Sequence, residues 1–333
     1  MAWKEQLLFY KQSPYQRIAF FTESDGSLSL TLDDYWQFNS KCEHIYHECL
    51  FTMPGLFPKN LKNVLILGGG DGLGVRELLK YKTVEHIDMV DLDPEMIKFA
   101  KTNIFMKNLN KDSMNNPKLK VEVTDAKKWL AKPVTRKYDL VIVDFPDPTS
   151  DLLWTLYTKE LYGQIASRLS KTGIVAIQSS TYNTKTFELI YDKLDKVFPF
   201  ILGYHTGASS VFCGFFLTSF TPIKMQRPIP VSCRWLKPEL INMILGLPVA
   251  NSKTKKKKSR QILDPDKLVL RAKPQLKGPA SLGELGQPDP NFFPDKNPIN
   301  VPQEGPSLFA SPVVKGGLAV AFIIPLLLKV MGK

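Results

Sequence analysis

Two aspartates, Asp144 and Asp147, lie three positions apart in a proline-containing segment that reads Asp-Phe-Pro-Asp-Pro. The segment follows an apolar run over residues 140–143, which is typical of a buried strand. A carboxylate at such a point can accept a proton from a reacting group or pair with a cation. Asp-Pro pairs also occur in ordinary turns, so this segment by itself leaves both interpretations open.

A glycine-rich segment connects another apolar run, residues 64–67, to a predicted helix, and it reads Gly68-Gly69-Gly70-Asp71-Gly72-Leu73-Gly74. Glycines at positions 68, 70 and 72 allow a sharp turn and a close approach of the backbone to a ligand, and the helix presents free N–H groups. Such turns also exist for steric reasons alone. The GxGxG spacing, without a second glycine segment, favours a nucleoside sulfonium ligand over a dinucleotide.

Three further aspartates follow predicted strands. Asp91 and Asp93 come about 20 residues after the glycine segment, where a carboxylate can accept hydrogen bonds from ribose hydroxyls. Because Asp93 precedes Pro94, we expect it to be the N-cap of a helix, which leaves Asp91 for the sugar. Asp125 follows the third strand. It suits an adenine amino group and could equally cap a helix over residues 126–130.

The elements that position these residues follow an alternating pattern. Apolar runs separated by helical segments predict a parallel sheet covered on both faces, and the runs are residues 64–67, 86–90, 120–123, 140–143 and 174–177. The predicted fold is therefore α/β, a Rossmann-like, doubly wound sheet over residues 61–249. The carboxyl ends of its strands share one edge, where such folds bind ligands.

The first 60 residues predict a small β domain. Residues 17–22 and 27–32 flank Asp25-Gly26 and predict a hairpin. A helix over residues 43–53, ended by Pro54-Gly55, should follow it. At the other end of the α/β domain, we expect a last strand pair that includes residues 211–219.

The C-terminal part differs in composition, because residues 222–333 hold 16 of the 25 prolines. We interpret residues 250–311 as a linker rich in proline and lysine. Residues 312–333 contain an apolar stretch that predicts an anchor to a membrane or a partner protein. Beyond residue 250, 14 Lys and Arg stand against 6 Asp and Glu, so +8 of the net charge of +12 belongs to this tail.

The composition also excludes several classes of protein. The body before residue 251 is close to neutral, which argues against nucleic-acid binding. The cysteines and histidines show no metal-ligand spacing, so no metal site is expected. Scattered cysteines and the absence of a signal peptide predict a reduced, cytoplasmic protein, with membrane association through the C-terminus as one alternative.

Taken together, these motifs resemble the polyamine aminopropyltransferases, the spermidine synthase family, over roughly residues 10–220. The segments that carry the resemblance are Ser13-Pro14-Tyr15-Gln16-Arg17-Ile18, Gln37, Glu43-His44-Ile45-Tyr46-His47-Glu48, the glycine segment, Asp91-Leu92-Asp93-Pro94, Asp125-Ala126, residues 144–148 and Gln178-Ser179. Details of the glycine and aspartate segments look most like a bacterial branch in which this domain follows membrane helices. The resemblance also implies the class I fold of S-adenosylmethionine-dependent methyltransferases.

The resemblance implies transfer of an aminopropyl group from decarboxylated S-adenosylmethionine to a diamine such as putrescine, which gives spermidine and methylthioadenosine. The donor would be a co-substrate, and no tightly bound cofactor is expected. Residues matching Gln37 and Asp71 contact the donor, those matching Asp91 hold its ribose and those matching Asp125 its adenine. Tyr46 and His47 match residues that line the donor and amine pocket, and Gln178 would also bind the substrate.

This chemistry agrees with the paired aspartates. A diamine arrives protonated, because its amines have a reference pKa near ~10.4 like that of lysine. We therefore expect Asp144 to accept the proton of the attacking amine, and Asp147 to hold and orient an ammonium group.

The chain departs from the family pattern in three places. The segment over residues 205–215 lacks the usual aromatic residue over the amine and has Cys213 in place of a tryptophan. Cys42 replaces an acidic residue, and the long tail has no counterpart. These departures leave open a retired enzyme that serves as a structural subunit of a larger assembly, besides a homo-oligomeric enzyme. A methyltransferase is disfavoured, because the paired aspartates and the Tyr-His-Glu segment would then be unexplained.

Overall fold

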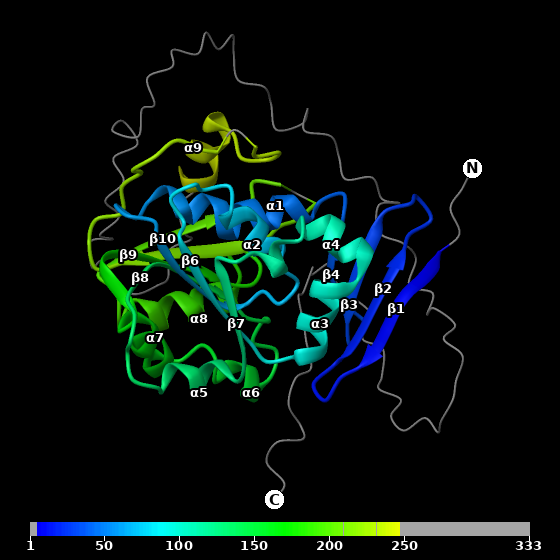
Figure 1. The fold of residues 1–333 in the computed structure, drawn as a ribbon. Helices are drawn as coiled ribbons and strands as arrows, with labels where there is room; N and C mark the ends of the chain where they lie inside the picture. The colour runs from blue at the N-terminus through cyan, green and yellow to red at the C-terminus, as the bar shows by residue number, and fades with distance from the viewer. Residues whose placement is uncertain (1–4, 209, 231, 247–333) are drawn as a thin grey trace, which may run out of the picture. The chain divides into compact units, whose positions relative to one another are not determined.

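Two β-sheets organise the part of the chain that the structure, a computed structural model, describes: residues 5–208, 210–230 and 232–246. One sheet has four strands and the other seven, and Figure 1 shows both with the helices that surround them. The predicted linker over residues 250–311 and the predicted anchor segment over residues 312–333 lie outside the described residues.

The seven-stranded sheet carries all the apolar runs that the sequence pattern assigned to strands. Its strands run in the order β10-β11-β9-β8-β5-β6-β7, and β5 to β9 are parallel. They are β5 (Asn63–Gly68), β6 (His86–Asp91), β7 (Leu119–Val123), β8 (Tyr138–Asp144), β9 (Leu169–Gln178), β10 (Phe200–His205) and β11 (Gly214–Ser219). The chain leaves β5 in one direction toward β6 and β7 and later continues from β8 to β9 in the other. The strand order therefore reverses between β5 and β8, which is where open α/β sheets form their binding crevice.

Helices cover both faces of this sheet. Neighbouring residues of β5 point to opposite sides, so that Ile66 lies in one apolar core and Leu65 in the other. Helices α2 (Leu73–Leu78), α3 (Pro94–Thr102) and α4 (Ile104–Asn110) contribute to the first core, and α5 (Ala126–Leu130), α7 (Lys159–Ala166) and α8 (Lys185–Leu194) to the second. The predicted doubly wound α/β arrangement is confirmed.

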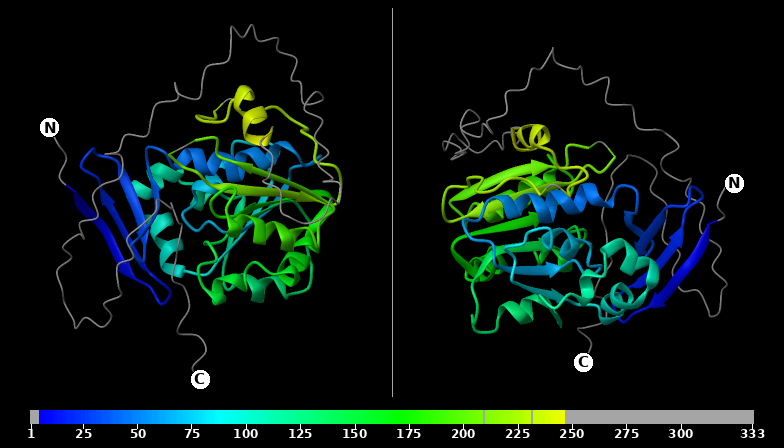
Figure 2. Two further views of the ribbon diagram at one scale, coloured as in Figure 1. Left: turned by 180° about the vertical axis from the view of Figure 1, so that it is seen from behind. Right: turned by 45° about the horizontal axis from the view of Figure 1, so that its top comes forward.

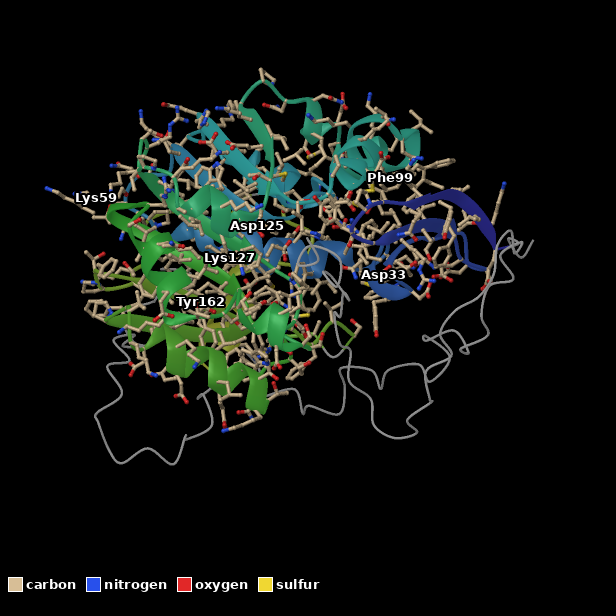
Figure 3. The ribbon with its side chains drawn as sticks, turned by 90° about the horizontal axis from the view of Figure 1, so that it is seen from below. Asp33, Lys59, Phe99, Asp125, Lys127 and Tyr162 are labelled. Carbon is tan, nitrogen blue, oxygen red and sulfur yellow. The ribbon has the colours of Figure 1, made fainter. Side chains whose placement is uncertain are left out.

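The four-stranded sheet is antiparallel and consists of β1 (Gln6–Gln12), β2 (Arg17–Thr22), β3 (Leu28–Leu32) and β4 (Tyr35–Asn39). The predicted hairpin is β2 with β3, and β1 and β4 extend it on either side. Phe99 of α3, labelled in Figure 3, packs against the small sheet. Its ring stacks on that of Phe9 with 4.4 Å between the ring centroids, and its centroid lies 5.3 Å from that of Phe20.

The helix predicted over residues 43–53 has three parts. It begins as α1 (Glu43–His47), continues as a π-helical turn over Glu48–Thr52 and ends as a 3₁₀ turn over Met53–Leu56. The prediction that Pro54 ends it was wrong, because the helical turns continue to Leu56, three residues beyond the predicted end at Met53. Proline is tolerated in the first turn of a helical segment, where its missing N–H has no partner to lose.

The segment that follows β11 ends in α9 (Pro238–Gly246). This helix packs on β10, the edge strand of the large sheet (Figure 2). The strand predicted from residue 211 begins only at Gly214, because the carbonyl of Val211 accepts the Thr206 hydroxyl instead of a strand partner. Within the described residues, no helix combines the length and the apolarity needed to cross a membrane.

Candidate active site

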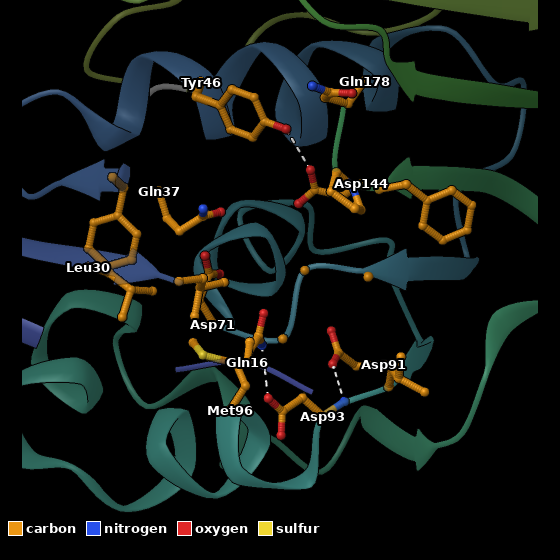
Figure 4. Close-up of a pocket in the computed structure, with 18 of the residues that line it drawn as sticks. Gln16, Leu30, Gln37, Tyr46, Asp71, Asp91, Asp93, Met96, Asp144 and Gln178 are labelled. Atoms are coloured by element: carbon orange, nitrogen blue, oxygen red, sulfur yellow. Dashed lines mark hydrogen bonds between the residues drawn. The ribbon is translucent and has the colours of Figure 1, made fainter. Parts of the chain in front are cut away.

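A pocket opens at the carboxyl ends of β5, β6 and β8, where the strand order reverses. The small sheet closes it from the other side with residues of β3 and β4 such as Leu30 and Gln37 (Figure 4). Most of the residues assigned to the site from the sequence line this pocket, namely Gln37, Tyr46, His47, Gly68, Gly70, Asp71, Asp91, Asp125, Asp144 and Gln178. Gly72 and Asp147 are not among its lining residues.

The glycine segment brings the backbone close to the neighbouring strand ends. A Cβ atom at Gly70 would lie 2.7 Å from the carboxylate of Asp91, so only glycine fits there without displacing that side chain. Gly72 has a positive φ of 80° at the start of α2, and its Cβ position faces Met114 at 2.4 Å. Gly72 therefore permits the turn into α2 and its packing, and does not form the wall of the pocket.

Asp91 ends β6 with its carboxylate at the pocket. Its Oδ1 accepts the N–H of Asp93 at 3.0 Å (Figure 4). Burial raises the pKa of Asp91 to about 6, and the nearby charges of Asp93 and Asp71 act in the same direction. Burial removes hydrating water from this carboxylate. A hydroxyl group or a cation of a bound ligand would stabilise its ionised form in place of that water.

Asp93 is the N-cap of α3, as predicted, and accepts the N–H of Glu95 at 3.0 Å. Its second oxygen accepts hydrogen bonds from Ser13 Oγ and Gln16 Nε2, both at 2.8 Å. The turn between β1 and β2 therefore fixes the end of β6, which carries Asp91.

Asp125 is the N-cap of α5, one of the two roles that the sequence left open. Its side chain caps α5 by accepting the N–H of Lys128 at 2.9 Å, and the residue also lines the pocket. An N-cap carboxylate has acceptor capacity left for a second donor.

Asp144 ends β8 and is held by a tyrosine of α1. Tyr46 Oη donates a hydrogen bond of 2.5 Å to Asp144 Oδ1 (Figure 4). Burial raises the pKa of Asp144 to about 6; the charges of Asp71 and Asp91 also raise it, while Tyr46 and His47 oppose the shift. A buried carboxylate with this pKa is ionised at neutral pH and is a better proton acceptor than an exposed one.

Asp147 lies behind the lining. It is 3% exposed, and its two oxygens accept hydrogen bonds from Gln178 Nε2 at 2.6 Å and Ser180 Oγ at 2.8 Å. Burial raises its pKa to about 6. Asp147 thus meets the pocket through the amide of Gln178, which it orients, and the structure does not place its carboxylate at the surface of the pocket.

The pocket is acidic. Its lining includes Glu43, Asp71, Asp91, Asp93, Asp125 and Asp144, whereas its basic lining residue is His47, with no Lys or Arg among the lining residues in the described part of the chain. Such a site favours a positively charged ligand. Across the described residues no group of three or more His, Cys, Asp or Glu side chains could hold a metal ion.

Sequence reasoning gave no role to several residues that the structure brings to the site. Glu43 is 3% exposed and lines the pocket beside His47, and Gln16 fixes Asp93. Both residues fall in segments that carry the family resemblance, which was the available signal. Val211 also lines the pocket, whereas Cys213 is buried outside the lining, so the segment that departs from the family pattern presents an aliphatic wall.

The comparisons with known proteins agree with this geometry. A family model described as the spermine/spermidine synthase domain matches residues 43–212. Polyamine aminopropyltransferase 2 of Bacillus anthracis is 45% identical over 174 residues, which is 52% of this chain and 48% of that protein. The polyamine aminopropyltransferase of Leptospira interrogans is 33% identical over 247 residues, 73% of this chain and 49% of that protein. The chain spans about half the length of these curated relatives.

Two solved structures with a similar fold are spermidine synthases. One, crystallised in complex with the transition-state analogue AdoDATO, aligns with a TM-score of 0.66 and 27% identity over 73% of this chain and 86% of its own. The spermidine synthase of Thermotoga maritima aligns with a TM-score of 0.63 and 26% identity over 73% of this chain and 85% of its own. With a family model that covers half of its residues and a pocket at the expected strand ends, the chain belongs to the spermine/spermidine synthase family.

Proposed function

We propose that the chain transfers an aminopropyl group from decarboxylated S-adenosylmethionine to a diamine such as putrescine, giving spermidine and methylthioadenosine. The observation that carries this proposal is the acidic pocket at the strand-order reversal, in which Asp71, Asp91 and Asp144 face one space (Figure 4). Relatives named polyamine aminopropyltransferases, and a structural neighbour that binds AdoDATO, support it.

The donor half of the pocket suits an adenosyl sulfonium compound. Asp91 would accept hydrogen bonds from the ribose hydroxyls, and Asp125 would take the adenine amino group, with the backbone of Gly68 and Gly70 beside the sugar. Asp71 would pair with the ammonium of the aminopropyl group, assisted by Gln37 from the small sheet.

The reacting groups meet near Asp144. The amine nitrogen forms a bond to the carbon next to the sulfonium, the C–S bond breaks, and its electron pair stays on sulfur as the neutral thioether of methylthioadenosine. Because the diamine arrives protonated, Asp144 would accept one proton of its ammonium before this bond forms, so that a neutral nitrogen attacks; the product nitrogen is then a secondary ammonium. Tyr46 holds this carboxylate in place by donating to its Oδ1, and Gln178, oriented by Asp147, would bind the far end of the diamine.

A direct assay tests the proposal. Purified full-length chain is incubated with decarboxylated S-adenosylmethionine and putrescine, cadaverine or spermidine, and methylthioadenosine and the new polyamine are measured by mass spectrometry. Methyl transfer from S-adenosylmethionine would instead identify a methyltransferase. If the donor and methylthioadenosine raise Tm but no product forms, the chain is a retired member of the family; if neither ligand raises Tm, the assignment of the pocket is wrong.

The rate should depend on pH below neutrality. The pKa values of Asp91 and Asp144 are both raised to about 6, so both groups become protonated as the pH falls through 6. Protonation of Asp91 removes a negative charge that attracts the donor. Protonation of Asp144 removes the group that accepts the amine proton. At saturating amine, kcat/KM for the donor should therefore fall by at least about tenfold per pH unit below pH 6. Initial rates between pH 5 and pH 8 measure this, and a flat profile over that range would contradict it.

We also propose that the chain works as a homo-oligomer or as a subunit of a larger complex, and that residues 312–333, outside the described part, anchor it to a membrane or a partner protein. The full-length chain should float with anionic liposomes, whereas a chain ending at Pro248 should stay behind, because lysines of the tail add about 1 kcal/mol each near an anionic surface. Equal flotation of both chains would exclude the tail as a membrane anchor and leave a protein partner as its binding site.

A further inference from the structure

A buried chain of ion pairs leads from α2 to the pocket. Arg76 donates two hydrogen bonds to the carboxylate of Glu43, Nη1 to Oε1 at 2.9 Å and Nη2 to Oε2 at 2.8 Å. On its other side, Glu43 Oε2 lies 3.0 Å from His47 Nδ1. His47 Nε2 in turn lies 3.8 Å from Asp71 Oδ2. Basic and acidic groups thus alternate along a line that ends at the pocket.

The surroundings of His47 select its protonated form. Its Nδ1 faces two acceptors of one residue, the carbonyl of Glu43 at 2.7 Å and the carboxylate of Glu43 at 3.0 Å. Its Nε2 faces the carboxylate of Asp71, and Asp144 at the end of β8 adds a further negative charge. A neutral imidazole would turn one lone pair toward an acceptor, whereas an imidazolium donates from both nitrogens.

The pKa values agree with this geometry. Burial alone would lower the pKa of His47, but the carboxylates of Asp71 and Glu43 outweigh it and raise that pKa to about 10. Burial likewise acts to raise the pKa of Glu43, but His47 and Arg76 lower it to about 2. His47 and Glu43 are therefore both charged across the neutral range.

His47 lies at the pocket end of a cluster of buried charges. The buried cations next to it are Arg76 and Lys80, the buried anions are Glu43, Glu48 and Glu77, and the half-exposed Arg234 lies 4.0 Å from Glu43. Among these groups, His47 is the cation that faces Asp71. Buried charges without partners are costly, which ties the state of His47 to its neighbours.

Asp71 is held at both oxygens. Its Oδ1 accepts the N–H of Leu73 at 2.8 Å, at the start of α2, and its Oδ2 faces His47. Without a cation at His47, only the hydrogen bond to Oδ1 would remain, and the carboxylate could rotate about it.

We propose that Arg76 and Glu43 are positioning residues, which hold His47 as an imidazolium against Asp71 and thereby fix the Asp71 carboxylate for the aminopropyl ammonium of the donor. This inference rests on the proposed function. It predicts different effects on the binding of two ligands, because decarboxylated S-adenosylmethionine carries that ammonium and methylthioadenosine lacks it.

The test compares Glu43→Gln with Glu77→Gln by calorimetry at pH 7.5. Both glutamates are buried and pair with Arg76, but only Glu43 contacts His47. E43Q should lower the affinity for decarboxylated S-adenosylmethionine about tenfold or more and change the affinity for methylthioadenosine by less than about twofold. E77Q should leave both affinities within about twofold, although each variant lowers Tm. If E43Q does not fold, His47→Gln, which removes the cation directly, should show the same selective loss.

Histidine NMR supplies a readout besides binding. In the wild-type chain and E77Q, His47 should remain an imidazolium up to about pH 9, whereas in E43Q it should titrate between about pH 6 and 8. The affinity of E43Q for the donor should fall further through the same range.

Three results would overturn the inference while leaving the proposed function intact: equal loss of donor affinity in E43Q and E77Q, equal loss of both ligands in E43Q, or a neutral His47 in the wild-type chain at pH 7. A wild-type chain that binds neither ligand would contradict the proposed function, and the inference with it.

Discussion

Replacing Asp144 by asparagine should lower kcat by about 10²–10⁴-fold while leaving the affinity for methylthioadenosine within about twofold. Asparagine keeps the shape of the side chain and can still accept the hydrogen bond from Tyr46 at its oxygen. It cannot take up the proton that the attacking amine releases. The loss should therefore appear in the chemical step, which rapid mixing of saturating donor and putrescine would measure as a single turnover.

Asp91→Asn is the matched control for this experiment. Both aspartates end a parallel strand, line the same pocket and have a pKa raised to about 6. Asp91 is assigned to the ribose, so its replacement should make the binding free energy of methylthioadenosine less favourable by about 1.5–3 kcal/mol. If D144N weakens methylthioadenosine as much as D91N does, Asp144 binds the nucleoside and another group is the base.

The surroundings of the two paired aspartates explain why Asp144 and not Asp147 is the expected base. Asp144 lines the pocket with one oxygen bound by Tyr46. Both oxygens of Asp147 already accept hydrogen bonds from Gln178 and Ser180. The three-residue spacing suggested that both reach the substrate, but it could not show that Gln178 would stand between Asp147 and the pocket.

The large sheet was predictable because its central strands are buried on both faces. Strands β5, β8 and β9 therefore contain continuous apolar runs over residues 64–67, 140–143 and 174–177, whereas β7 at the edge alternates valines with charged residues. Strand β1 was missed although residues 7–10 form an apolar run, and it lies largely exposed at the edge of the small sheet. Helix α9 begins at a proline in a segment whose composition resembles a linker. It packs on β10, and no local pattern reveals that contact.

The site was predictable only where residues follow strands. Asp71, Asp91, Asp125 and Asp144 could be placed together because the carboxyl ends of parallel strands share one edge. No sequence pattern assigned Arg76 or Glu77 to the site. Their burial in the charge cluster depends on how α1 packs across α2, 33 positions away along the chain for Arg76 and Glu43.

Glu48 should be among the most stabilising residues of the domain. Its carboxylate is fully buried and accepts the backbone N–H groups of Arg234 at 2.7 Å, Trp235 at 2.8 Å and Leu236 at 2.9 Å. Lys80 Nζ pairs with it at 3.2 Å. Burial alone would raise the pKa of Glu48, but these N–H groups and Lys80 lower it, so the group is ionised. It ties the segment before α9 to the helical segment that carries Tyr46 and His47.

Glu48→Ala should therefore lower the free energy of unfolding by about 3–5 kcal/mol, measured by urea denaturation, because it leaves Lys80 and three backbone donors without their acceptor. Glu48→Gln keeps the volume but turns an NH₂ group toward those donors, so a similar loss is expected. Glu85→Ala is the surface control. Glu85 pairs with Lys62 at 2.8 Å, but their side chains are 62% and 57% exposed, and exposed pairs contribute little. If E48Q is as stable as the wild-type chain, the negative charge of Glu48 does not hold the C-terminal segment, and the apolar contacts of α9 with β10 must do so instead.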